Sequence, residues 1–269
     1  MTIDFATIKE SQRAGWQAGD YPRVGNTLQI IAELLVEAAD VRAGQRVLDV
    51  ACGQGNAALA AARRFADATG VDYAVNLLEQ GRARAAAEHL PVTFTEGDAE
   101  ALPGPDRSFD VVLSTVGVMF APDQQRAADE LVRVTVPGGK IALASWTPSG
   151  MVGHLFKANA GWATPPAGLR PAVQWGTPER LAELFGDRVE WVSLTTRQYV
   201  FRYHSPEHFS QWFRTNYGPM TRIAGSLSTE ESERYADDIA AVAREFNQAT
   251  DGTVVAPSDY LEAVGVVRG

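Results

Sequence analysis

The sequence contains a single cysteine, Cys52, among its 269 residues. One cysteine excludes a disulfide within the chain, which fits a reducing compartment. No stretch reaches the roughly 18 consecutive apolar residues of a membrane-spanning helix, and residues 1–5 lack the basic and apolar regions of a signal peptide. We therefore expect a cytoplasmic protein with no membrane partner.

Positive charge is scarce as well. There are 24 lysines and arginines against 33 acidic residues, the net charge is −9, and no block of basic residues occurs. This balance argues against a protein that holds nucleic acid by neutralising its phosphates. The partner that we expect is a small molecule, and the sequence leaves open whether the protein is a monomer or a homodimer.

The most informative stretch of the chain is residues 46–56. Val47, Leu48 and Val50 form a short apolar run that ends at Gly53 and Gly55, and the alanine-rich residues 57–62 follow. This order predicts a strand, a tight turn and a helix. Because glycines allow close approach of a ligand and the first N–H groups of a helix are free, the pattern predicts a small-molecule site.

Two kinds of ligand fit this turn. Gly53, Gly55 and Ala58 match the dinucleotide spacing G-x-G-x-x-A, and Asp72 follows about twenty residues on, as a ribose-binding acid would. Asp49, however, places a carboxylate four positions before the first glycine, where it would repel a pyrophosphate and attract an ammonium group. This acid favours S-adenosylmethionine, which carries an amino-acid head and a sulfonium but no phosphate.

At this point the chain resembles the class I S-adenosylmethionine-dependent methyltransferases of the small-molecule type, whose first motif is an acid followed by a Gly-x-Gly turn. The third small position of their loop is often glycine and is Asn56 here. Two further segments match the family: Gly97-Asp98-Ala99 with Leu102-Pro103 after the third predicted strand, and Pro137-Gly138-Gly139 before the fifth. The resemblance covers residues 45–146.

The resemblance and the strand ends together define a predicted cofactor site. Asp72 ends the second strand and is expected to accept both ribose hydroxyls, with Tyr73 against the adenine. By resemblance, the Asp98 side chain accepts from the adenine amino group and the Ala99 N–H donates to a ring nitrogen. The full predicted set is Asp49, Ala51, Gly53, Gly55, Asp72, Tyr73, Asp98, Ala99 and Ser114. No metal is expected, since residues 114–123 offer only one acid, Asp123.

The predicted fold is α/β and Rossmann-like, with a mostly parallel seven-stranded sheet and helices on both faces. We expect one methyltransferase domain over 1–269: lid helices in 1–40 (helices over 4–20 and 25–39), a cofactor-binding core in 41–146, and a substrate-side segment in 147–269. In that last segment, residues 148–175 are predicted to be irregular. A helical cap over about 205–249 is predicted before a last strand at 260–267.

The predicted reaction is methyl transfer from S-adenosylmethionine to an O, N or C atom of a small, partly apolar acceptor. Trp16 and Tyr21 are candidate lid residues, and His154, Tyr21 and Tyr217 are candidate bases by location alone, so no catalytic residue is assigned. Two alternatives stay open: an NAD(P)-dependent oxidoreductase, and a protein that binds S-adenosylmethionine without transferring its methyl group.

Overall fold

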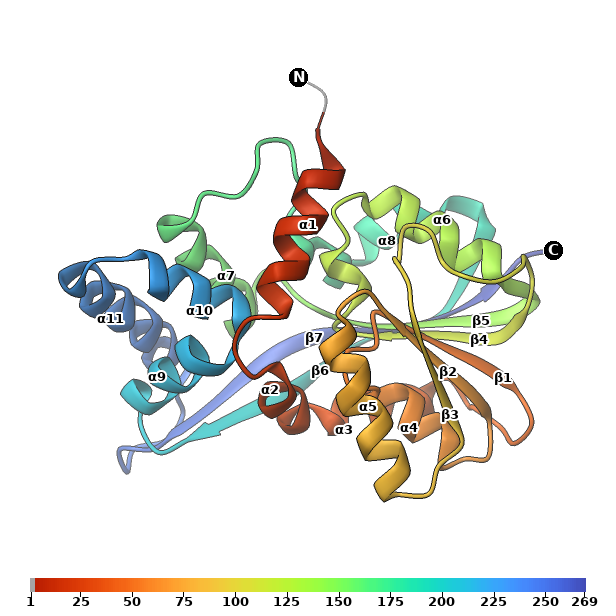
Figure 1. Ribbon diagram of the computed structural model, residues 1–269, viewed down its shortest axis with the longest axis horizontal. Coiled ribbons are helices and arrows are strands. Elements are labelled where there is room, and N and C mark those ends of the chain that lie inside the picture. Colours follow the sequence, from red (N-terminus) through yellow and green to blue (C-terminus); the bar gives the residue numbers. More distant parts are fainter. Residues whose placement is uncertain (1–2) are drawn as a thin grey trace.

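The computed structural model describes residues 3–269 and contains one seven-stranded sheet with the order β3-β2-β1-β4-β5-β7-β6. The first five strands of that order are parallel, and β7 runs antiparallel between β5 and β6. The strands are β1 (Arg46–Val50), β2 (Asp67–Asp72), β3 (Val92–Glu96), β4 (Phe109–Thr115), β5 (Thr135–Trp146), β6 (Val189–Tyr203) and β7 (Val254–Val267). This confirms the predicted fold class (Figure 1).

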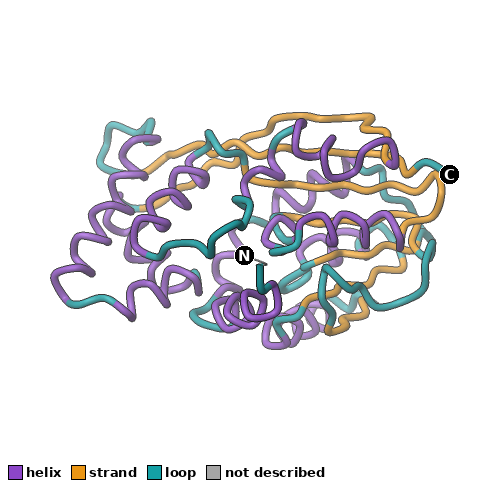
Figure 2. The backbone as a smooth tube through the Cα atoms, turned by 90° about the horizontal axis from the view of Figure 1, so that it is seen from above, coloured by secondary structure: helices purple, strands orange, loops and turns teal. Residues whose placement is uncertain are grey.

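Helices cover both faces of the sheet (Figure 1), and the view from above shows further helices beyond one end of the strands (Figure 2). The core helices are α3 (Gln29–Ala38), α4 (Asn56–Ala62), α5 (Val75–Ala87), α6 (Gln124–Val134) and α8 (Pro178–Phe185). The remaining helices are α1 (Phe5–Trp16), α2 (Tyr21–Thr27), α7 (Met151–Trp162), α9 (Pro206–Asn216), α10 (Gly218–Ser226) and α11 (Thr229–Phe246), with short 3-10 turns at Val118–Phe120, Ala172–Gly176 and Gly186–Arg188.

The core forms around the central strands β1 and β4. Val47, Leu48, Val111, Val112 and Leu113 are all buried, which is what uninterrupted apolar runs predict for strands covered on both faces. The small side chains of α4 are buried too. They let this helix lie close to the sheet, directly after the glycine turn.

The N-terminal region contains three helices where the sequence predicted two. The helix expected over 4–20 ends at Trp16, and the helix expected over 25–39 is interrupted at Leu28 (φ −96°, ψ 5°), which separates α2 from α3. Pro22 explains the earlier start of α2, because proline is well tolerated in the first turn of a helix.

The prediction of an irregular segment over 148–175 was wrong, because α7 lies within it. Gly153 had suggested a break in the helix, but it serves packing. A Cβ at this position would lie 2.2 Å from the Pro148 carbonyl oxygen. The glycine therefore permits close packing of a helix. Strand β7 also begins earlier than expected, at Val254, and β5 extends back to Thr135 with an irregularity in its pairing to β4.

Helices α9, α10 and α11 connect β6 to β7, where the sequence predicted helices. Ser205 caps α9, and Ser228 with Glu231 forms the predicted capping box at the start of α11. The division of the chain into lid, core and cap stays a prediction. Within residues 3–269, no helix is both long and apolar enough to cross a membrane.

Candidate functional site

A cavity of about 870 Å³, including the space at its mouth, lies beyond the carboxyl ends of β1 and β4, where open parallel sheets bind ligands. Six of the nine predicted site residues line it: Asp49, Ala51, Gly53, Tyr73, Asp98 and Ala99. The N-terminal helices and the loop after β4 contribute the opposite walls. The structure therefore brings together residues from across the first 122 positions of the chain.

The glycine turn takes a backbone conformation that requires its glycines. Gly53 and Gly55 have φ values of 54° and 80°, in the left-handed region that side chains disfavour. A Cβ on Gly55 would lie 2.6 Å from the ring of Phe94. Gly55 does not itself line the cavity, so in this structure its visible role is to shape the turn that ends β1 and starts α4.

Asp49 lies under the start of α4, with 1% of its surface exposed. Its Oδ2 accepts a hydrogen bond from the Ala58 N–H at 2.9 Å. Burial raises the pKa of Asp49 to about 7, and the charge of the nearby Asp72 acts in the same direction. The hydrogen bond from Ala58 acts in the opposite direction. The carboxylate that favoured a cationic ligand is thus close to its titration point at neutral pH, and a positive charge in the cavity would ionise it.

We expect Asp49→Asn to stabilise the protein more strongly at high pH than at low pH. Because Asp49 has a raised pKa in the folded state, the folded state holds its proton while the unfolded state loses it, so stability falls as the pH rises from about 4 to about 7. Each pH unit between 5 and 7 costs the wild type about 1.4 kcal/mol. The advantage of the variant should therefore grow by about 3 kcal/mol between pH 5 and 8. Urea unfolding of both proteins at these two pH values measures it, and a constant difference would contradict the raised pKa.

Asp72 is buried behind the glycine turn, and both of its carboxylate oxygens are already bonded to backbone. One oxygen accepts from the Gly53 N–H and the other from the Ala74 N–H, each at 2.8 Å. Burial raises its pKa against the effect of these bonds. Asp72 is not among the residues lining the cavity, but a carboxylate has about four acceptor positions, so two remain for a ligand.

Asp98 is paired with an amine from α1. Lys9 Nζ lies 2.6 Å from Asp98 Oδ2 and 2.9 Å from Glu100 Oε2, and Lys9 lines the cavity. A ligand amino group that binds Asp98 therefore has to share this carboxylate with Lys9. Ala99, the next residue, is buried and lines the cavity as expected.

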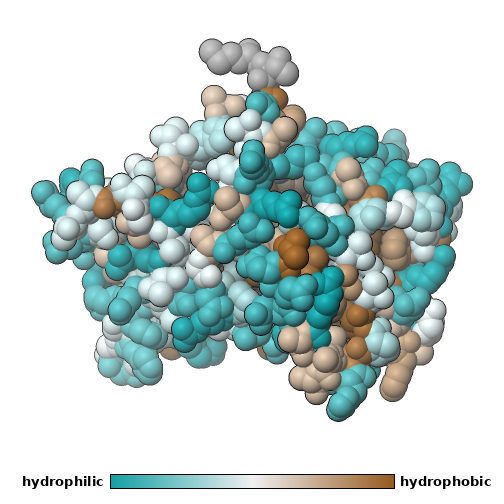
Figure 3. Space-filling view, in the orientation of Figure 1, coloured by the Kyte–Doolittle hydropathy of each residue, from teal (hydrophilic) through white to brown (hydrophobic). Residues whose placement is uncertain are grey.

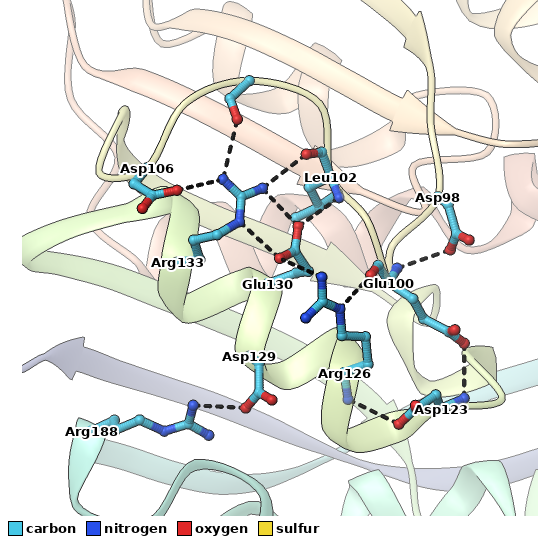
Figure 4. Close-up of polar contacts among 11 residues, drawn as sticks. Asp98, Glu100, Leu102, Asp106, Asp123, Arg126, Asp129, Glu130, Arg133 and Arg188 are labelled. Atoms are coloured by element: carbon cyan, nitrogen blue, oxygen red, sulfur yellow. Dashed lines mark hydrogen bonds and ion pairs between the residues drawn. The ribbon is translucent and has the colours of Figure 1, made fainter.

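The loop that carries Asp98 is anchored to α6 by a network of charged groups (Figure 4). Glu130 accepts from the Leu102 N–H at 2.7 Å and pairs with Arg133 at 2.7 Å. Glu100 accepts from the Asp123 N–H at 2.8 Å, and its carbonyl accepts from Arg126 at 3.0 Å. These contacts fix the position of the loop relative to α6.

Ser114 does not line the cavity. Its hydroxyl donates to the Val50 carbonyl at 2.7 Å and accepts from the Val118 N–H at 2.8 Å, so it links the ends of β1 and β4. The next three residues, Thr115, Val116 and Gly117, line the cavity instead. The role of Ser114 as a cofactor contact stays a prediction.

A second, apolar cavity of about 420 Å³ adjoins the first, and we call it the chamber. The two share Trp16, Tyr21, Leu28, Val116 and Phe120 as walls. The other walls of the chamber come from α2, the sheet, α7 and α9 with its C-cap: Val24, Trp146, Val152, Leu155, Phe156, Phe201, Phe213 and Tyr217. The outer surface on the face of Figure 1 is mostly hydrophilic (Figure 3), in contrast to these walls.

Sequence reasoning missed two site residues on α1, Lys9 and Gln12. With Trp16 they recur at positions i, i+3 and i+7, which places them on one helix face, and all three line the cavity. The Gln12 Oε1 and Thr115 Oγ1 atoms are buried without a hydrogen-bond partner among the described residues. Since buried polar atoms are normally paired, these two fit a cavity that receives a polar ligand.

His154, a candidate base, lines neither cavity. Its Nδ1 lies 3.1 Å from Glu245 Oε1, and its ring packs against Phe246. Trp16 and Tyr21 do line both cavities, and their rings pack edge to face at 5.4 Å. In the described part of the chain, no group of three or more histidine, cysteine or acidic side chains is arranged to hold a metal ion.

The comparisons with known proteins agree with this geometry. Residues 47–139 match the family model described as a methyltransferase domain. The Mycobacterium tuberculosis protein Rv1403c, which has no assigned function, is 41% identical over 223 residues, covering 81% of each chain. Demethylmenaquinone methyltransferase of Deinococcus radiodurans is 33% identical over 171 residues, covering 56% of this chain and 71% of that one.

Solved structures show the same fold. The Bacillus halodurans protein BH2331, named as a candidate methyltransferase, superposes with a TM-score of 0.65 at 20% identity, covering 88% of this chain and 99% of that one. The arrangement of the strands and helices is therefore one that occurs in other solved proteins.

Proposed function

The chain belongs to the class I S-adenosylmethionine-dependent methyltransferases, and we propose that it moves a methyl group from S-adenosylmethionine in the first cavity to a small, largely apolar acceptor in the chamber. The family membership contradicts the oxidoreductase alternative. The observation that carries the proposal is the pair of adjoining cavities, one with buried acids and one with aromatic walls, that share Trp16 and Tyr21.

The residues present suit the cofactor. Asp72 would hold the ribose through its two free acceptor positions, and Asp98 with the Ala99 N–H would hold the adenine. Asp49 and the open backbone at Gly53 would face the positively charged methionine end. When bound, the cofactor supplies a methyl group on a sulfonium, whose sulfur is already a good leaving group.

The protein contributes alignment and exclusion of water. Helices α1 and α2 cover the cavity, and Trp16 packs against Tyr21, Phe120 and Tyr217 at the boundary with the chamber. Orienting two reactants in this way can lower the activation free energy by about 7–11 kcal/mol. The relative named demethylmenaquinone methyltransferase and the apolar walls both favour an apolar acceptor over a polymer.

Calorimetry with purified protein tests the proposal. We expect stoichiometric heat with S-adenosylmethionine and none with NADH. Incubation with candidate acceptors should then release S-adenosylhomocysteine. Protection against heating by NADH, with none from S-adenosylmethionine, would contradict the proposed ligand, and tight binding without product from any acceptor would favour a binding protein that transfers no methyl group.

A further inference from the structure

Among the described residues that line the chamber, the titratable groups are few and of one kind. Every titratable side chain that lines it is a phenol, Tyr21 or Tyr217. Their rings lie 6.3 Å apart, and both pack against Trp16, at the boundary with the first cavity. Two phenol rings thus lie at the boundary of the chamber, beside the position from which a methyl group would arrive.

Both phenols are held in the neutral form. Burial and the Asp72 charge raise the pKa of Tyr21 to about 12, and burial with the neighbouring Tyr21 and Tyr235 raises the pKa of Tyr217 well above its usual value. No hydrogen bond from a described residue contributes to either shift. A neutral phenol is a poor base and a good donor, particularly to an anion.

Resting on the proposed function, we propose that the acceptor is an aromatic thiol or phenol that binds as its anion, with the anionic atom hydrogen-bonded by Tyr21 and Tyr217 and the ring held between Phe120, Phe156 and Trp146. Aromatic walls accommodate a flat ring through edge-to-face contacts. The desolvation of an anion is offset by the two donors and by the sulfonium across the shared wall.

The transfer then needs no base from the protein. The acceptor loses its proton to water before it binds. A lone pair on its sulfur or oxygen forms the new bond to the methyl carbon, while the bond from that carbon to the sulfonium breaks and its electron pair stays on the cofactor sulfur. Anion and cation become two neutral products, so no proton moves during the step.

Other groups that titrate lie outside the chamber. The first cavity adds Lys9, Asp49, Cys52, Tyr73 and Asp98. Since these groups would affect cofactor binding, rates are to be measured at saturating S-adenosylmethionine. Behind the chamber wall, Tyr260 packs against Trp146 with Glu262 and Arg197 close to it, and Tyr199 packs against Trp146 with its hydroxyl bonded to the Thr27 carbonyl.

The first experiment measures binding without transfer. The absorbance of 4-nitrophenol reports its ionisation, and it is titrated into the protein saturated with sinefungin, in which an amine replaces the sulfonium and no methyl can leave. We expect the bound phenol to ionise at least about one pH unit below the free phenol. Tyr217→Phe should weaken binding of the anion by about 10- to 100-fold, as expected for a hydrogen bond to a charged group. Tyr203→Phe, in a half-buried tyrosine that lines neither cavity, should leave it unchanged.

The second experiment distinguishes a thiol acceptor from a phenol acceptor. Release of S-adenosylhomocysteine is measured with thiophenol, phenol, benzyl alcohol and aniline, against reactions without enzyme. We expect thiophenol or phenol to exceed the other two by about 100-fold or more, and the half-maximal pH to move down when a nitro group makes the acceptor more acidic. The preferred member of the first pair identifies sulfur or oxygen as the reacting atom.

Several results would overturn the inference while leaving the proposed function intact. Two of them are binding of 4-nitrophenol in its neutral form, and rates with benzyl alcohol or aniline that equal those with thiophenol or phenol. The other two are a half-maximal pH that does not change with the acidity of the acceptor, and failure of every acceptor of the series although S-adenosylmethionine binds. Absence of S-adenosylmethionine binding would instead overturn the proposed function, and the inference with it.

Discussion

Replacing Asp72 with alanine is expected to weaken S-adenosylmethionine binding by about 3–6 kcal/mol, because two charge-assisted hydrogen bonds to the ribose are lost at about 1.5–3 kcal/mol each. The substitution also leaves the Gly53 and Ala74 N–H groups without their present acceptor. Because Gly53 belongs to the glycine turn, the substitution also removes a contact that holds this turn beside the cavity. Isothermal calorimetry of wild type and variant measures the loss directly.

Asp67→Ala is the matched control for this change. Asp67 begins the same strand that Asp72 ends, and its side chain is exposed at the N-terminal end of β2 and does not line the cavity. Its replacement should leave the dissociation constant unchanged. Unfolding midpoints of both variants separate a loss of binding from a loss of fold, and a wild-type dissociation constant for Asp72→Ala would refute the ribose assignment.

A second large effect is expected from Gly218→Ala, which should destabilise the protein by about 3 kcal/mol and lower its melting temperature by roughly 5–10 °C. A Cβ on Gly218 would lie 2.0 Å from the Gly15 carbonyl oxygen and 2.5 Å from that of Ala18. These are backbone atoms at and beyond the end of α1, so the two segments have to separate. Scanning calorimetry measures the shift.

Gly225→Ala, in the same helix α10, provides the comparison. Nothing lies within 4 Å of a Cβ built at this position, so the change should be neutral or stabilising by up to about 1 kcal/mol. Because α1 carries Lys9, Gln12 and Trp16 to the cavity, Gly218→Ala should also weaken cofactor binding while Gly225→Ala does not. Equal melting temperatures for the two variants would show that α1 and α10 are not packed as described.

Much of the architecture could be predicted because the signals are local. Val47, Leu48 and Val50 form an apolar run that can only be buried in a sheet covered on both faces, and the paired glycines mark the turn after it. Asp98 and Ala99 were found by motif, and the structure places both at the cavity. Each of these inferences needed only neighbouring residues.

The features that the sequence did not reveal depend on contacts across long separations. Lys9 reaches Asp98 over 89 positions, and the Ser114 hydroxyl bonds to the Val50 carbonyl over 64. Gly153 and Gly218 belong to helices and serve close packing, although glycines in a sequence suggest turns. Helix α7 was missed for this reason.

The wall formed by Trp16 and Tyr21 belongs to both cavities. Because the two sites share these rings, the affinity for the cofactor and the affinity for the acceptor are linked. If the cofactor arranges these two rings so that the acceptor binds more tightly, then the acceptor must tighten the cofactor by the same factor. In a ternary complex built in this way, each partner is held more tightly when the other is present, whichever of the two arrives first.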